Sequence, residues 1–166
     1  MANYAVVRTD NMLGTDARSM LVSIKYKGTD GATDTAIENG NVLKVGALIE
    51  GEREIYVGSD VAANDKITDV VLIASPEVMY DERKKNLDEY INEAGKACRG
   101  YRLHSGDVFS VTKEALNGTP AVGNVVELAA GTKLSVSAEA TGSTVVGTII
   151  AEDIVGRYTY YAIKVN

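Results

Sequence analysis

The sequence predicts an α+β protein that is predominantly β, a small antiparallel barrel or sandwich with one inserted amphipathic helix. Three observations predict this class. A Gly-Asn-Val or Gly-Asp-Val phrase opens segments at 40–42, 106–108 and 123–125, and a run rich in β-branched residues follows each one. Glycine and Asn/Asp suit turns, whereas valine favours strands. The 16 glycines suit many turns, and only one segment has apolar residues at helical spacing.

Strand patterns recur along the chain. The fully apolar run at 70–74 predicts a central strand, and Gly46 predicts a bulge within its strand. In the last strand, Tyr161, Ile163 and Val165 share the face expected to meet the core. The segments 124–128 and 133–137 are expected to form a hairpin, as are the last two strands around Gly156. The predicted strands are 4–7, 21–26, 42–49, 54–57, 70–74, 107–112, 124–128, 133–137, 144–151 and 157–165.

The inserted helix is predicted at about 76–99. Pro76 suits a first helical position and Gly100 a position just beyond the last turn. An apolar stripe at helical spacing is expected to cover one side of the β body, with charged residues opposite. The stripe consists of Leu87, Ile91, Ala94 and Cys98.

The chain is expected to divide near residue 36. Residues 1–36 are interpreted as an N-terminal arm or peripheral hairpin, although an ordinary first hairpin of the domain explains their pattern equally well. Residues 37–166 are interpreted as a β-rich domain that carries the helix.

Composition argues against several functional classes. The net charge of −6 disfavours sequence-independent nucleic-acid binding, which needs Lys and Arg to neutralise phosphates. A single cysteine and a single histidine exclude an intrachain disulfide and four-ligand Cys/His zinc sites. No apolar run approaches membrane-spanning length, and no signal-peptide pattern follows Met1. We therefore expect no cofactor, no metal, no nucleic acid and no membrane partner.

Candidate catalytic residues are few. His104 has no nucleophile motif beside it, and Cys98 lies on the apolar stripe, where a buried thiol is expected. Glu152 and Asp153 are an acidic pair of the kind that glycoside hydrolases use, but the end of a solvated strand explains them better. The sequence predicts a protein that is not an enzyme.

Tyrosines in the last strand are more informative. Tyr158 and Tyr160 are candidates for an exposed interface, because tyrosine is enriched in protein contacts and alternation turns some of these rings outward. Ordinary strand packing is the alternative.

Three phrases, in the segments 106–111, 122–128 and 146–153, together resemble tailed-bacteriophage capsid decoration proteins, also called head-stabilising or cement proteins. The segments 7–15 and 72–83 resemble phage head proteins as well. The resemblance implies a structural virion protein that binds the outer surface of an assembled capsid, bridges capsomers and stabilises the shell. It implies the major capsid protein as partner, self-association as a trimer, and assembly in the host cytoplasm.

The resemblance also implies an N-terminal arm that pairs with capsid strands. Its candidate contacts are Tyr4, Val6, Arg8, Asp10, Met12 and Leu13. The chain is longer than compact cement proteins and has the predicted helix, which leaves its oligomeric state and docking position open. The alternative function is a β-barrel carbohydrate- or host-surface-binding module displayed on a virion. A hydrolase that uses Glu152 and Asp153 is a third hypothesis.

Overall fold

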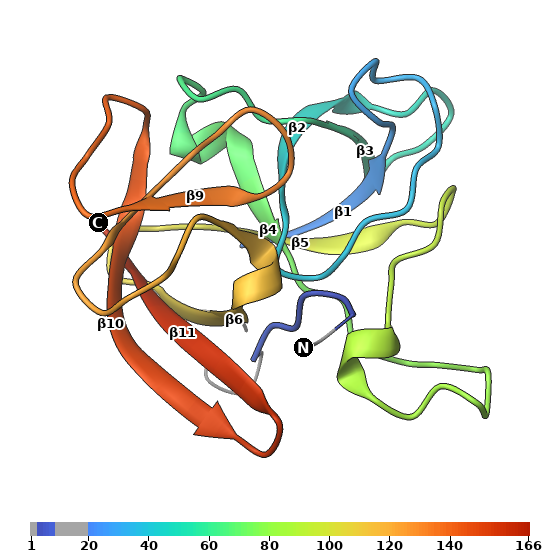
Figure 1. Ribbon diagram of the computed structural model, residues 1–166. Coiled ribbons are helices and arrows are strands. Elements are labelled where there is room, and N and C mark those ends of the chain that lie inside the picture. The colour runs from blue at the N-terminus through green and yellow to red at the C-terminus, as the bar shows by residue number, and fades with distance from the viewer. Residues whose placement is uncertain (1–2, 9–19) are drawn as a thin grey trace.

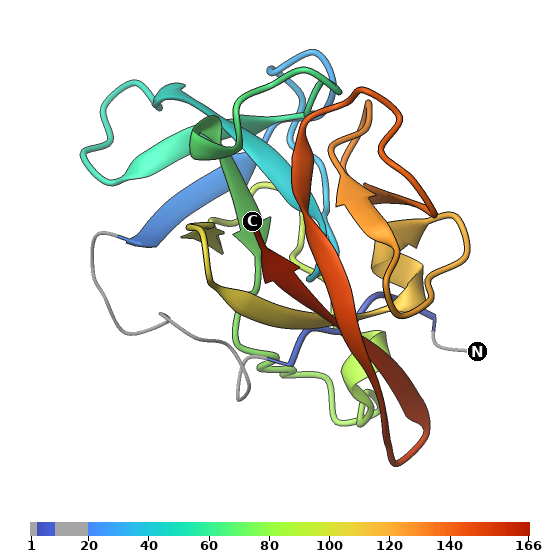
Figure 2. The same ribbon diagram turned by 90° about the vertical axis from the view of Figure 1, so that its left-hand side faces the viewer.

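The computed structural model describes residues 3–8 and 20–166. The chain forms a closed five-stranded barrel and a curled six-stranded sheet that packs against it (Figures 1 and 2). The barrel strands are β1 (Leu21–Tyr26), β2 (Val42–Leu48), β3 (Ile55–Ser59), β4 (Val70–Ile73) and β5 (Cys98–Arg102). The sheet strands are β6 (Val108–Thr112), β7 (Leu116–Asn117), β8 (Val125–Glu127), β9 (Leu134–Ser137), β10 (Val145–Val155) and β11 (Tyr158–Val165). Short 3₁₀ helices are η3 (Ile67–Asp69), η4 (Leu87–Glu89) and η5 (Lys113–Ala115). The predominantly β class is confirmed.

The barrel has the strand order β1-β3-β2-β4-β5 and closes where β1 meets β5, with Val22 opposite Gly100. Four of its strand pairs are antiparallel, but β1 and β3 run parallel, with Ser23 opposite Ile55. The barrel is therefore mixed rather than purely antiparallel. The pairing of β2 with β3 shifts register between Val45 and Leu48, which confirms the bulge predicted near Gly46.

The three Gly-Asn/Asp-Val phrases mark strand starts, as predicted. Strands β2, β6 and β8 begin at Val42, Val108 and Val125. The glycines at 40, 106 and 123 have φ of 85°, 94° and 92°, a region that side-chain-bearing residues rarely adopt.

Strand β4 is the wall shared by the two halves of the molecule. Val71 and Ile73 point into the barrel interior, whose other members include Ile24 and Leu43. Val70 and Leu72 belong instead to the larger core between the barrel and the sheet. Because both faces are buried, the strand has no polar alternation, which explains the apolar run seen in the sequence.

The six-stranded sheet has the order β6-β11-β10-β8-β9-β7. The predicted hairpins β8–β9 and β10–β11 are both present, and β10 contains a register shift between Ile149 and Ala151. Ile163 and Val165 are buried in the larger core and Tyr161 packs against it, as predicted for that face.

The described part of residues 1–36 is built into the body of the molecule. Strand β1 lies in the barrel wall between β3 and β5. Residues 3–8 run along β6, where Val7 pairs with Val111 and the Thr112 N–H donates to the Val6 carbonyl at 3.0 Å. Ala5 and Val7 are part of the larger core. These described residues are thus not a detached arm, nor do they form a peripheral hairpin.

The helix predicted at about 76–99 is wrong. Residues 76–97 form a projecting loop, here called the 76–97 loop, whose only helical turn is η4, and Cys98 begins β5. The burial pattern is the opposite of the one expected for the helix. Leu87 and Ala94 are exposed, whereas Asp88 and Asn92 are buried. The buried polar groups bond to distant segments instead of facing water, and tertiary contacts of this kind override helical propensity.

Candidate functional site

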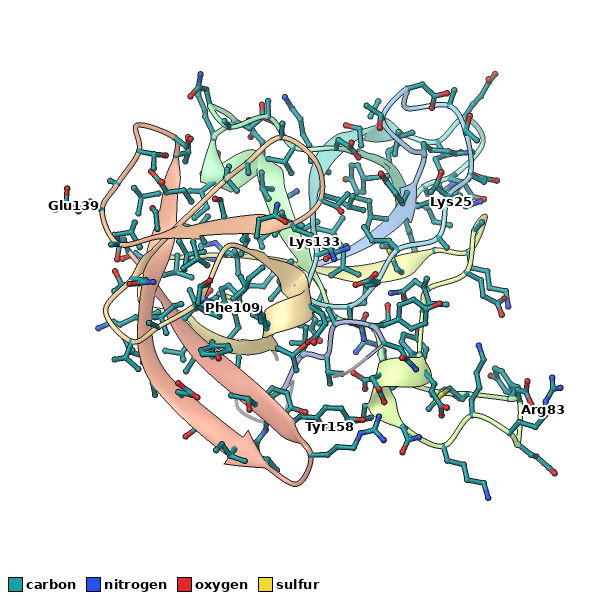
Figure 3. The ribbon with its side chains drawn as sticks, viewed as in Figure 1. Lys25, Arg83, Phe109, Lys133, Glu139 and Tyr158 are labelled. Atoms are coloured by element: carbon teal, nitrogen blue, oxygen red, sulfur yellow. The ribbon has the colours of Figure 1, made fainter. Side chains whose placement is uncertain are left out.

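Three segments that are distant in the sequence meet around Asp88: residues 3–8, the 76–97 loop and the end of the β10–β11 hairpin (Figures 1 and 3). The Asp88 side chain is fully buried. Its carboxylate accepts hydrogen bonds from the Asn3 N–H at 3.1 Å and from the Tyr158 hydroxyl at 2.8 Å. The Arg157 guanidinium donates to both carboxylate oxygens. One carboxylate therefore fixes the middle of the loop to two other segments.

The electrostatics of this contact favour the ionised carboxylate. Burial raises the pKa of Asp88, but the bonds from Tyr158, Asn3 and Arg157 together outweigh burial and hold the pKa below its ordinary value. Burial and the bond to Asp88 raise the pKa of the Tyr158 hydroxyl, which stays protonated and donates. The charge that Asp88 carries is thus satisfied inside the protein.

Aromatic and cationic groups stack beside the carboxylate. The Arg157 guanidinium lies 5.1 Å from the centre of the Tyr158 ring, and the Arg8 guanidinium lies 5.7 Å from that of Tyr160. The two rings meet edge to face, with centres 6.1 Å apart. Stacks of this kind add modest stability and hold the side chains in one geometry.

The predicted interface tyrosines differ in exposure. Tyr158 is half-buried, and its hydroxyl is used by Asp88. Tyr160 is only 3% exposed, so the prediction that it faces solvent is wrong. Alternation places Tyr160 away from the larger core, but Arg8 covers its ring.

The predicted capsid contacts also differ in where the structure places them. Tyr4 and Arg8 are half-buried in the cluster around Asp88, and the Tyr4 N–H donates to the Asp88 carbonyl at 3.2 Å. Val6 is buried, so its side chain is not available to a partner in this conformation, which corrects that part of the prediction. Asp10, Met12 and Leu13 lie outside the described residues.

Large apolar side chains are exposed at this end of the molecule. Tyr80 is 92% exposed, and Val78 and Leu87 are exposed on the same loop. The loop surrounds a hollow of about 540 Å³. Its lining mixes aromatic, apolar and charged groups, among them Pro76, Val78, Tyr80, Asp81, Lys84, Tyr90 and Glu93. Such a surface can make apolar contact at its centre and polar contact at its rim.

The groups weighed for catalysis are separated in the structure. Burial raises the pKa of the Cys98 thiol to about 12, and its Sγ donates to the Ile24 carbonyl at 3.1 Å. His104 Nδ1 lies 3.9 Å from the Asp107 carboxylate in an exposed turn. Glu152 and Asp153 are exposed neighbours on β10. Within residues 3–8 and 20–166, no three His, Cys, Asp or Glu side chains are placed to hold a metal ion.

A second buried carboxylate holds the turn after β9. Glu127 is 1% exposed and accepts hydrogen bonds from the Thr141 N–H at 3.0 Å and the Thr141 hydroxyl at 2.8 Å. Burial raises its pKa, but these bonds and one from Ser137 outweigh burial and leave the pKa below its ordinary value. All of these donors to Glu127 are neutral, whereas Asp88 also accepts hydrogen bonds from the charged guanidinium of Arg157.

The sequence reasoning missed both carboxylates. A signal for Glu127 was present, because it lies between Val126 and Leu128 in an otherwise apolar run. A weaker sequence signal was present for the 76–97 loop. Asn86 followed by Glu89 is the spacing of a capping box, and the Asn86 N–H donates to the Glu89 carboxylate at 2.9 Å.

Comparison of the chain with family models, curated proteins and solved structures finds no match. In the described part of the chain, no helix has the length and apolar character needed to cross a membrane.

Proposed function

We propose that this protein is a structural virion protein that binds the outer surface of an assembled phage capsid through the 76–97 loop and stabilises the shell by bridging capsomers. The observation that carries the proposal is the exposure of Val78, Tyr80 and Leu87 on a loop anchored by a buried carboxylate. Large apolar groups that gather on an exposed projection are typical of protein contact sites. The capsid as partner comes from the sequence resemblance.

The anchoring of the loop favours binding. A surface fixed before contact loses less conformational freedom when the complex forms. Asp88 ties the middle of the loop to residues 3–8 and to the hairpin, so Tyr80 projects from a restrained base. Exposed charged residues of both signs, Glu82, Arg83 and Lys84, follow Tyr80 on the same loop and can supply a polar rim.

The direct test is co-sedimentation of the purified protein with undecorated capsid shells, together with the heat resistance of the shells. The wild-type protein is expected to sediment with shells and to raise their disruption temperature. The Tyr80→Ser variant is expected to lose most of the binding, since tyrosine anchors contribute much of the affinity at interfaces. Leu48→Ser, an exposed apolar position on β2 outside the loop, is the matched control and is expected to bind normally.

Failure of the wild-type protein to sediment with any shell would contradict the capsid proposal. Equal binding by Tyr80→Ser and wild type would contradict the role of the loop. Analytical ultracentrifugation of the free protein measures the self-association as a trimer that the resemblance implies.

A second candidate function is glycan or host-surface binding. The observation that favours it is the position of Tyr80 and Tyr90 beside Asp81 and Glu93 around one hollow, because sugars bind to aromatic faces flanked by polar groups. A glycan screen of wild type and Tyr80→Ala distinguishes this function from capsid binding. Tyr160→Ala is unsuitable for the screen because that ring is buried.

A further inference from the structure

The outer half of β10 has a strand neighbour on one side only. The strand pairs with β11 as far as Val155 opposite Tyr158. On its other side, pairing with β8 ends at Thr148 opposite Val125, followed only by backbone bonds between Ile149 and residues 123–124. Within the described chain, no strand pairs with that side of residues 150–155, here called the free edge of β10. Figure 2 shows the hairpin extending beyond the sheet.

The side chains of the free edge are unusual for a solvated strand. Ile154 is 76% exposed, and Ile150 and Val155 are exposed as well. Val122, from the loop before β8, is a fourth exposed apolar residue near the start of this edge, since the adjacent Gly123 N–H donates to the Ile149 carbonyl at 2.8 Å. Between the apolar positions lie two exposed carboxylates, Glu152 and Asp153.

We propose that the free edge of β10 binds an extended segment of a partner protein by strand addition, and that this segment alternates apolar and basic residues. Six strand residues span about 20 Å, enough for a short added strand. Backbone hydrogen bonds supply affinity in this mode, and alternating side chains supply specificity. Identification of the partner as the capsid protein rests on the proposed function, whereas the strand addition itself does not.

Charge distinguishes a basic partner segment from a second copy of this chain. In a two-fold antiparallel pair of free edges, Glu152 and Asp153 of one copy would lie opposite or next to the same carboxylates of the other. Like charges placed across strands are destabilising, and each copy carries a net charge of −6. Lysine or arginine on the incoming strand would instead meet one of the two carboxylates, because Glu152 and Asp153 lie on opposite faces of β10.

The opposing explanation is that the edge is protected. Charged side chains and bulges are devices by which proteins keep exposed edges from pairing. The free edge has two charges and follows the register shift between Ile149 and Ala151. Under this explanation the edge binds no strand of any composition.

The test is titration of the full-length protein into a fluorescently labelled peptide of about eight residues that alternates valine with lysine. We expect saturable binding measured by anisotropy. The same peptide with methylated backbone nitrogens keeps its charge but cannot form a strand ladder, so it is expected to bind at least roughly tenfold more weakly. A peptide with glutamate in place of lysine is expected not to bind.

The protein variant that tests the charge argument is Glu152→Lys combined with Asp153→Lys. It is expected to weaken binding of the lysine peptide at least roughly tenfold and to allow binding of the glutamate peptide. The matched control is Glu52→Lys with Glu54→Lys, two exposed carboxylates outside β10 that give the same change in net charge. The control is expected to bind the lysine peptide within about twofold of wild type.

Three outcomes would overturn the inference: no binding of the lysine peptide, equal binding of the methylated peptide, or a dimer of the free protein that Glu152→Lys alters. Co-sedimentation with shells is measured on the same variants. Shell binding without peptide binding rejects the strand addition alone, and peptide binding without shell binding rejects the capsid proposal alone.

Discussion

The barrel and the six-stranded sheet both bury apolar side chains, but the sheet adds a close backbone contact and buried carboxylates. The barrel interior is an apolar cluster of aliphatic side chains with Tyr26 and Cys98, and its glycines 58 and 100 leave room for side chains from adjacent strands. In the sheet, Gly147 leaves room for the backbone of the adjacent strand, at Lys164. Two buried carboxylates, Asp88 and Glu127, then fix loops to the sheet strands.

This difference separates two ways of stabilising β structure. Side chains that fill a volume can be exchanged or can move, so the barrel is expected to tolerate compensating substitutions. A backbone contact or a buried charge with defined donors has no substitute nearby. Substitutions in the sheet are therefore expected to be more costly and harder to rescue.

The largest expected effect is that of Gly147→Ala. A Cβ at this position overlaps the carbonyl oxygen of Lys164, so β10 and β11 must separate. We expect a loss of roughly 4 kcal/mol or more in the free energy of unfolding, measured by urea denaturation, or failure to fold. A loss below about 1 kcal/mol would mean that the two strands have room to move apart.

Asp88→Ala tests the carboxylate that anchors the loop. The substitution leaves the Tyr158 hydroxyl and the Asn3 N–H without their acceptor, and we expect a loss of about 2 kcal/mol in urea denaturation. Hydrogen exchange is expected to increase in the 76–97 loop and not in the barrel strands. Arg157→Met is the comparison, and it is expected to cost less because the Tyr158 hydroxyl and the Asn3 N–H still donate to the buried carboxylate. Equal losses for the two variants would identify the ion pair, rather than the hydrogen bonds, as the anchor.

Gly100→Ala tests whether the barrel tolerates compensation. The new Cβ would lie 2.8 Å from Val71 Cγ2, and overpacking of this kind costs about 1–3 kcal/mol. Because the obstacle is a side chain, the double variant with Val71→Ala is expected to lose less than the sum of the two single losses. Additive losses in a double-mutant cycle would show that the barrel is as rigid as the sheet.

Acid is expected to weaken the sheet side more than the barrel. The folded-state pKa values of Asp88 and Glu127 lie below their ordinary values, so the unfolded chain binds protons more readily. The stability that they contribute is present above the ordinary carboxyl pKa of about 4 and is lost as pH falls through the folded-state pKa. Glu127→Gln is expected to show a shallower fall in unfolding free energy between about pH 5 and pH 3 than wild type. An unchanged slope would contradict the role of Glu127.

The difference between local burial and contacts of distant segments also explains how much of the fold could be predicted from the sequence. The run at 70–74 identified a central strand because burial on both faces acts on each residue locally. The 76–97 loop was mistaken for a helix because its conformation depends on Asp88 meeting Arg157, which lies 69 residues away. Periodicity detects which residues share a face but not which distant segment covers that face.

Part of the candidate site could also be predicted from the sequence. Tyr158 and Arg8 were named from the sequence, and the structure brings both into the cluster around Asp88. The burial of Tyr160 was not predictable, because alternation cannot reveal that Arg8 lies over its ring. The exposed Tyr80 was missed because the predicted helix gave that tyrosine no distinct role.

Closure of the barrel by β1 and β5 has a consequence for synthesis of the chain. Strand β1 ends at Tyr26, but its antiparallel partner is complete only at Arg102, so the ribosome must add 76 residues (102 − 26) before the barrel can close. At translation rates of about 5–20 residues per second this takes roughly 4–15 s. During that interval β1 and its apolar neighbours are exposed to other nascent chains and to chaperones.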